Sequence, residues 1–149
     1  MNIILSSNTR ALLARSLPAV EAGKNRLRLA LSTSLARSER DPGLSDTPDT
    51  IAALLLGFLV EQVKHLTESG EPSGLERHRS EHRLHGFDGR HYSRFGDVLV
   101  PVLRDTLGPS HPRAFASAWS DAFWAILQRM QQGDAPNAAP QASRIAEMA

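Results

Sequence analysis

Cysteine is absent from this 149-residue chain, and tyrosine and tryptophan occur only once and twice. Without cysteine the chain can form no disulfide, no thiolate nucleophile and no cysteine-ligated zinc or iron–sulfur site. The longest apolar run, Ile51 to Val60, is too short to span a bilayer. The opening stretch MNIILSSNTR holds too short an apolar segment for a signal peptide, so the sequence predicts a cytoplasmic protein.

An excess of charge of either sign is also lacking. The formal net charge is +1, which gives no overall field that would attract nucleic acid or anionic lipid. A hydrophobic content of 41% and a charged content of 22% are those of an ordinary soluble domain. The chain has no G-x-S-x-G motif and no glycine-rich phosphate loop after a strand, so serine hydrolase and nucleotide-binding chemistry are not indicated.

What is present is helical periodicity from end to end, with no convincing strand. We expect six to seven helices of unequal length, which favours an orthogonal bundle over a four-helix bundle. Ser7 or Asn8 would cap the first helix, and Pro18 should break or kink it. The domain is expected over residues 5–134, and the Ala/Pro-rich segment 135–149 is read as a flexible tail.

The later helices follow from caps and apolar spacing. Leucines at i, i+4 and i+8 predict one buried face for the second helix: Leu27, Leu31 and Leu35. The stretch TIAALLLGFLVEQVKHL is apolar on most sides and predicts the central helix, which Asp46, Thr47 or Asp49 would cap, with Pro48 near its first turn. A short polar helix should end at Gly86, and the next, with Pro101 inside it, should run to Leu107. Ser110 is expected to cap the last helix, which would run to about Gln132.

Histidines recur on the short polar helix. His78, His82 and His85 are spaced so that they share one helix face, which would suit metal or heme ligation. Arginines and a glutamate surround them, and on spacing alone a solvated polar face is the better explanation. A basic patch is a third interpretation, because arginines from 77 to 104 interleave with aromatic residues. Acidic residues dilute it and no nucleic-acid-binding motif accompanies it, which argues against nucleic acid as a partner.

His82 is also part of a longer sequence pattern. A histidine near the end of a short helix is followed at fixed distances by a glycine, by residue pairs that include aromatics, and by two further helices. The residues that carry this pattern are His82, Gly86, Phe87, His91–Tyr92, Phe95–Gly96, Leu107–Gly108, Ala118–Trp119 and Phe123. This resembles the globin family, especially bacterial single-domain globins and the globin domain of flavohemoglobins. The resemblance is clear over about residues 78–134, and over 8–66 it is limited to helix order and leucine spacing.

The resemblance implies a globin-like orthogonal bundle around heme b, with His82 as the proximal iron ligand. It implies that Tyr92 fixes the second ring nitrogen of His82, with Asp134 at the position of a family glutamate. Apolar side chains lining the heme would be those of Phe87, Phe95, Leu99, Phe123, Leu55, Ile51 and Ala52.

The distal side departs from the family pattern. The segment between the second and the central helix is shortened and lacks the family's clamping phenylalanine. The distal tyrosine position falls on Ser32, and the polar position of the central helix falls near Thr47 or Pro48. The usual donors to bound oxygen are therefore missing or replaced by short hydroxyls.

The sequence thus predicts a heme protein that binds oxygen, nitric oxide or carbon monoxide for sensing, storage or redox and nitrosative protection. Any dioxygenase or peroxidase-like activity would need a separate reductase, because the chain carries no flavin or nicotinamide domain. A signalling partner and a homodimer remain open. The alternatives are a globin-like domain that has lost heme and acts through protein contacts, and a helical protein of another kind, such as a nucleic-acid binder or a regulator.

Overall fold

The protein's structure, a computed structural model, describes residues 5–38 and 47–134, without the side chains of 132–134. This part of the chain is all helical, as predicted, and forms six helices: α1 (Ser7–Ala22), α2 (Lys24–Ser38), α3 (Pro48–Ser69), α4 (Leu75–Leu84), α5 (Gly89–Leu107) and α6 (Ala114–Asp134). The shortened segment before the central helix (39–46) and the predicted tail (135–149) lie outside the described residues.

Helix α1 begins one or two residues earlier than predicted and does not break. The Ser6 hydroxyl accepts the Thr9 backbone N–H at 3.0 Å and caps the helix. Pro18 lies inside α1, which continues to Ala22, so of the predicted break or kink the break does not occur. Leu13 and Val20, on either side of the proline, are fully buried, and this packing holds the helix together despite the missing backbone hydrogen bond.

The central helix is α3. Thr47 caps it through a hydrogen bond from the Thr50 N–H, and Pro48 occupies its first turn, as predicted. Ten of its residues are buried: Ile51, Ala52, Leu55, Leu56, Phe58, Leu59, Val60, Gln62, Val63 and Leu66. Among the described helices, α3 is also long and apolar enough to cross a membrane. More than half of its apolar window is buried inside the protein, as in a core helix.

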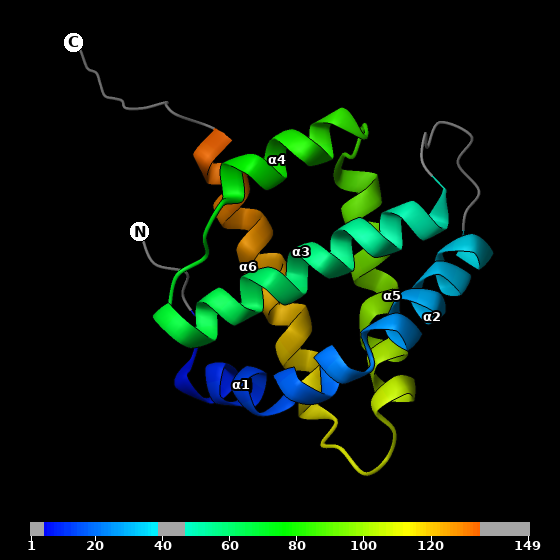
Figure 1. Cartoon of the computed structure of the whole chain (residues 1–149), viewed down its shortest axis with the longest axis vertical. Helices are drawn as coiled ribbons and strands as arrows, with labels where there is room; N and C mark the ends of the chain where they lie inside the picture. Colours follow the sequence, from blue (N-terminus) through cyan, green and yellow to red (C-terminus); the bar gives the residue numbers. More distant parts are fainter. Residues whose placement is uncertain (1–4, 39–46, 135–149) are drawn as a thin grey trace.

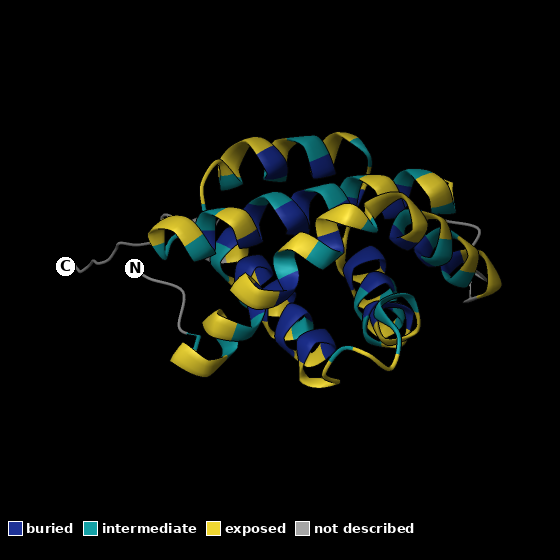
Figure 2. Cartoon of the chain, turned by 60° about the horizontal axis from the view of Figure 1, so that its bottom comes forward, coloured by how far each residue is buried: buried dark blue, intermediate teal, exposed yellow. Residues whose placement is uncertain are grey.

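The helices cross one another rather than running in parallel. Helices α5 and α6 pack together, and α3 runs across both (Figure 1). Helix α2 packs on α3 and α5, α1 packs on α3 and α6, and α4 rests against α6. Figure 2 shows buried positions on the inward side of each helix and exposed positions outside. Leu27, Leu31 and Leu35 form the buried face predicted for α2.

The last two helices differ from expectation at one boundary. Helix α5 runs through Pro101 to Leu107, as predicted. Helix α6 starts at Ala114, so the predicted cap at Ser110 was wrong. Between the two helices the His111 ring lies 2.7 Å from the Leu107 carbonyl oxygen, and the backbone turns at Gly108 with φ of 79°. The residues that the predicted cap at Ser110 would have placed in the first turn of the helix belong to this connecting turn instead.

Candidate functional site

The site is built at the C-terminal end of α4. Gly86 adopts a left-handed φ of 74°, and its N–H donates to the Arg83 carbonyl at 3.0 Å. The Phe87 N–H donates to the His82 carbonyl at 3.0 Å, which completes the glycine-terminated helix end known as the Schellman motif. That motif brings the residue after the glycine back over the last turn, so the Phe87 and His82 rings lie 5.5 Å apart.

His82 is held through one ring nitrogen. Its Nδ1 lies 3.0 Å from the Tyr92 hydroxyl, and this is the contact that the resemblance to globins implies. His82 is 1% exposed and Tyr92 is 8% exposed, so the hydrogen bond is buried. The distance does not fix which atom carries the proton. With the proton on Nδ1, the histidine donates to the tyrosine oxygen and Nε2 presents a lone pair.

The other ring nitrogen, Nε2 of His82, is buried and has no hydrogen-bond partner. Burial lowers the pKa of His82 from 6.5 to about 4, with smaller contributions from nearby His78 and His85. The imidazole is therefore neutral at pH 7, which is the form that binds metals. Burial also raises the pKa of Tyr92 to about 12, with help from the Asp88 carboxylate, so its hydroxyl stays protonated.

Aromatic rings surround His82. Phe58 of α3 contacts it edge-on with ring centroids 4.9 Å apart, and Tyr92 lies at 5.8 Å. Together with Phe87 these rings form a dry shell on several sides of the imidazole. A buried donor or acceptor without a partner costs free energy, so this nitrogen calls for an explanation.

The remaining apolar residues predicted to line the site share the same buried cluster. Phe95 and Phe123 pack with ring centroids 5.1 Å apart. The cluster also holds the other predicted lining residues: Leu99, Leu55, Ile51 and Ala52. All six are at most 3% exposed, whereas a cavity able to hold water would leave part of their surface exposed to it. These side chains therefore pack against one another, and a flat ligand could enter only if they separate.

The other histidines of the cluster have separate roles. His78 is only 5% exposed, so the solvated-face interpretation was wrong for it, and its Nε2 lies 2.9 Å from Glu61. His85 caps the end of α4 and is half-buried. Among residues 5–38 and 47–131, no three His, Asp or Glu side chains are placed to hold a metal ion.

His91 serves the start of α5. Its Nδ1 accepts the Asp88 N–H at 3.0 Å, while Asp88 Oδ1 accepts the Arg90 N–H at 2.9 Å. Hydrogen bonds and charge from Arg90, with a weaker contribution from His91, lower the pKa of Asp88 to about 2. The His91 ring stacks on Phe87 at 5.0 Å. Asp88 and His91 together form a capping box at the start of α5. This box and the Schellman motif at Gly86 fix the two ends of the turn between α4 and α5, which carries Phe87.

The predicted distal positions bring no donor into this shell. Ser32 is half-buried on α2, and Thr47 is exposed and occupied as the cap of α3. Pro48 is half-buried in the first turn of α3 and has no donor to offer. Asp134 ends α6, and its side chain lies outside the described residues.

Two residues of the site were not found from the sequence. Phe58 lies in the apolar run of α3 and carries no spacing signal that separates it from its neighbours. Glu61 is seventeen residues before His78, and only the tertiary fold, which lays α4 beside α3, brings the two together. The hydrogen bond from His78 lowers the pKa of Glu61.

No protein-family model matches the chain, and a search of the curated proteins finds no match. The functional argument therefore depends on the site's own geometry.

Proposed function

We propose that this chain is a heme-binding globin of the bacterial type, in which Nε2 of His82 binds the iron. One observation carries the proposal: Nε2 of His82 is buried, has no hydrogen-bond partner, and belongs to a ring held from behind by Tyr92. A buried ring nitrogen without a partner is costly for folding, and with the proton on Nδ1 its lone pair would be available to a metal.

The residues present suit heme by their chemistry. His82 would hold the iron, and Tyr92 would orient the imidazole and tune its basicity. Phe87, Phe95, Leu99 and Phe123 offer apolar contact to a porphyrin. Heme would supply an iron centre able to bind a small gas.

The α3 side favours gases that need no hydrogen-bond donor. Ile51, Ala52 and Leu55 are apolar and buried, and none can donate to a bound ligand. Carbon monoxide and nitric oxide depend less on a donor than oxygen does, so sensing or scavenging of these gases is favoured over oxygen storage. A turnover reaction would need a separate reductase. A cytoplasmic location is part of this proposal.

The packing of the helices is compatible with a globin-like arrangement. A central α3 crossing α5 and α6, with α4 ending at the candidate ligand, is what a heme pocket between crossed helices requires.

The test is an absorption spectrum of the purified protein after addition of hemin and removal of the excess. We expect a Soret band that depends on His82 and is lost or displaced in His82→Gly, with recovery when imidazole is added. His85→Ala is the matched control, because His85 is half-buried on the same segment, and it should leave the spectrum unchanged. The absence of a Soret band in the unaltered protein, or an identical band in His82→Gly, would refute the proposal.

A second candidate is a heme-free globin-like domain that works through protein contacts. It is favoured by the close packing of Leu55, Phe95, Leu99 and Phe123, which have no exposed surface at all. In that case the protein should unfold at the same denaturant concentration with and without hemin, whereas binding to the folded state alone raises the midpoint.

A further inference from the structure

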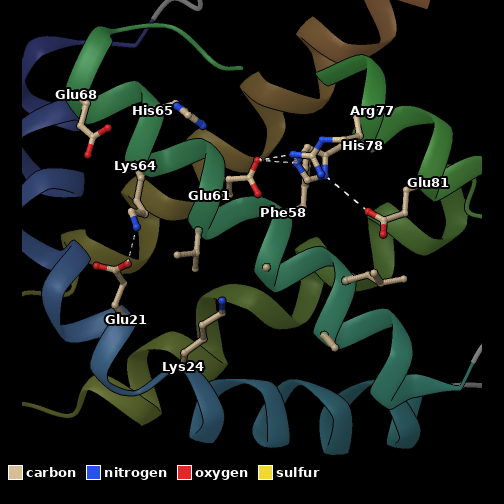
Figure 3. A pocket seen from close by; sticks show the side chains of 14 residues that line it. Glu21, Lys24, Phe58, Glu61, Lys64, His65, Glu68, Arg77, His78 and Glu81 are labelled. Atoms are coloured by element: carbon tan, nitrogen blue, oxygen red, sulfur yellow. Dashed lines mark hydrogen bonds and ion pairs between the residues drawn. The ribbon is translucent and has the colours of Figure 1, made fainter. Parts of the chain in front are cut away.

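Three histidines are buried in the described part of the chain, and two of them have a ring nitrogen without a partner. His78 shows the usual arrangement, because its Nε2 lies 2.9 Å from Glu61 in the cleft over α3 that both residues line (Figure 3). Nε2 of His82 and Nε2 of His91 are buried without a hydrogen-bond partner among the described residues. The proposed iron ligation accounts for His82, so the nitrogen of His91 remains to be explained.

The hydrogen bonds around His91 fix where its proton lies. The Asp88 N–H can only donate, and it lies 3.0 Å from Nδ1 of His91, so this nitrogen accepts. Oδ1 of Asp88 is farther from Nδ1, at 3.2 Å, and already accepts the Arg90 N–H at 2.9 Å. A ring whose Nδ1 accepts is neutral and carries its proton on Nε2. Nε2 of His91 is therefore a buried N–H donor that lacks an acceptor.

Helix capping explains only one of the two ring nitrogens of His91. The third position of a capping box needs a single acceptor for the N-cap N–H, and glutamate or glutamine usually supplies it. His91 does this through Nδ1. The second nitrogen adds a desolvated donor, which costs free energy unless an acceptor meets it. His91 is 1% exposed, so bulk water is not that acceptor.

His91 belongs to the same aromatic cluster as His82. The Phe87 ring contacts both imidazoles, with its centroid 5.0 Å from the His91 ring and 5.5 Å from the His82 ring. One aromatic side chain thus connects the surroundings of the two unpaired nitrogens, and a porphyrin is wider than that ring. The nearby Asp88 carboxylate, which would repel an anion, is paired with Arg90 at 3.2 Å.

We propose that the Nε2–H of His91 donates a hydrogen bond to a carboxylate of the heme. The inference rests on the proposed function and adds a second anchor to it. The pyrrole nitrogens of heme are bound to the iron, so its two carboxylates are the only strong acceptors that it brings. A hydrogen bond to a carboxylate is stronger than one between neutral groups. His82 would hold the iron, and His91 would fix the orientation of the porphyrin about the iron–histidine bond.

The first measurement compares the binding of hemin with that of hemin dimethyl ester, which lacks the charged carboxylates. His91→Asn removes the Nε2–H, while the asparagine oxygen keeps an acceptor near the position of Nδ1 for the Asp88 N–H. This variant should bind hemin about tenfold more weakly, as expected for the loss of a hydrogen bond to a charged group, and should bind the ester with little change.

Two further variants serve as controls for this comparison. His91→Gln has an amide that can both accept and donate, and it should keep most of the affinity for hemin. His111→Asn, at the turn between α5 and α6, replaces another histidine whose Nδ1 bonds to the backbone, and it should leave both affinities unaltered. Urea denaturation of the heme-free variants verifies that each of them is folded.

The second measurement needs no variant and no iron. The NMR shifts of imidazole nitrogens distinguish the two neutral tautomers, and the heme-free protein should show His91 with its proton on Nε2. On addition of zinc protoporphyrin, a diamagnetic substitute for heme, this proton should shift downfield because it enters a hydrogen bond. Zinc protoporphyrin dimethyl ester should leave it nearly in place. If His91→Asn does not fold, this measurement decides the matter.

The outcomes separate this inference from the proposed function. A His82-dependent Soret band, with equal hemin affinities in the unaltered protein and in His91→Asn, overturns the role of His91 and leaves heme binding intact. A proton on Nδ1 of His91 in the heme-free protein also overturns that role, whether or not heme binds. The absence of any Soret band in the unaltered protein overturns both proposals.

Discussion

The Tyr92 hydroxyl lies 3.0 Å from Nδ1 of His82, and the pair is buried between the end of α4 and the start of α5. Tyr92→Phe removes one partner and leaves Nδ1 without a hydrogen bond. We expect a loss of about 1–3 kcal/mol in the free energy of unfolding, measured by urea denaturation, as for a buried polar group left unpaired. In the heme-loaded protein the ferrous iron–histidine stretch should shift.

A double-mutant cycle gives the control for this pair. Tyr92→Phe should cost much less when His82 is already replaced by leucine, because no ring nitrogen is then left unpaired. Equal costs in both backgrounds, together with an identical iron–histidine stretch, would mean that the hydroxyl does not act on His82.

The stability of the heme-free protein should fall in mild acid. The pKa of His82 is 6.5 in an ordinary environment and about 4 in the folded chain. As the pH falls through 6.5, the unfolded chain takes up a proton that the folded chain does not bind until about pH 4. The free energy of unfolding therefore decreases between these two values and is independent of this group above and below them.

The His82→Gln variant isolates this contribution. It should show a smaller decrease in thermal unfolding temperature between pH 7 and pH 4, whereas His65→Gln should retain the decrease of the unaltered protein. Glu61 adds a separate loss at lower pH, because the hydrogen bond from His78 lowers its pKa and protonation removes that contact. The same decrease in His82→Gln as in the unaltered protein would rule out His82 as the group responsible.

Helices α1 and α6 are joined by a buried hydrogen bond. The Trp119 Nε1–H donates to the Ser16 hydroxyl at 2.8 Å, and both residues are fully buried. Ser16→Ala leaves the indole N–H unpaired and should lower the free energy of unfolding by about 1–3 kcal/mol. Ser34→Ala, at a half-buried serine of α2, should change it little. Equal unfolding midpoints for the two variants would contradict the assignment.

Two helical glycines should respond in opposite directions to alanine. A Cβ on Gly96 would lie 2.4 Å from the Trp124 ring, so Gly96→Ala should destabilise the protein by about 1–3 kcal/mol through overpacking of α5 against α6. Gly57 has open space around it, so Gly57→Ala should stabilise α3 by about 1 kcal/mol through helix propensity alone. Chemical denaturation measures both.

The indole ring provides the control for the first glycine. Trp124→Leu should restore much of the stability lost in Gly96→Ala, since the tip of the ring is the atom group that the new methyl meets. A loss that persists in the double variant would place the strain elsewhere.

The local parts of the fold could be predicted because they depend on neighbouring residues. The buried leucine face of α2, the Thr47 cap and Pro48 at the start of α3, and the end of α5 at Leu107 all follow from short-range patterns. The break at Pro18 does not occur, and the predicted cap at Ser110 was wrong. In both cases tertiary contacts compete with a local preference of similar size.

The sequence by itself determined the helical class, and its resemblance to the globin family supplied the expectation that Tyr92 contacts one ring nitrogen of His82. Only the tertiary structure decided that His78 is buried against Glu61, that Phe58 contacts His82, and that His78 and Phe58 line a cleft over α3. These contacts join α3 to α4, and their geometry depends on how α4 is placed beside α3. That placement is set by the packing of the whole core, and no periodicity within either helix encodes it.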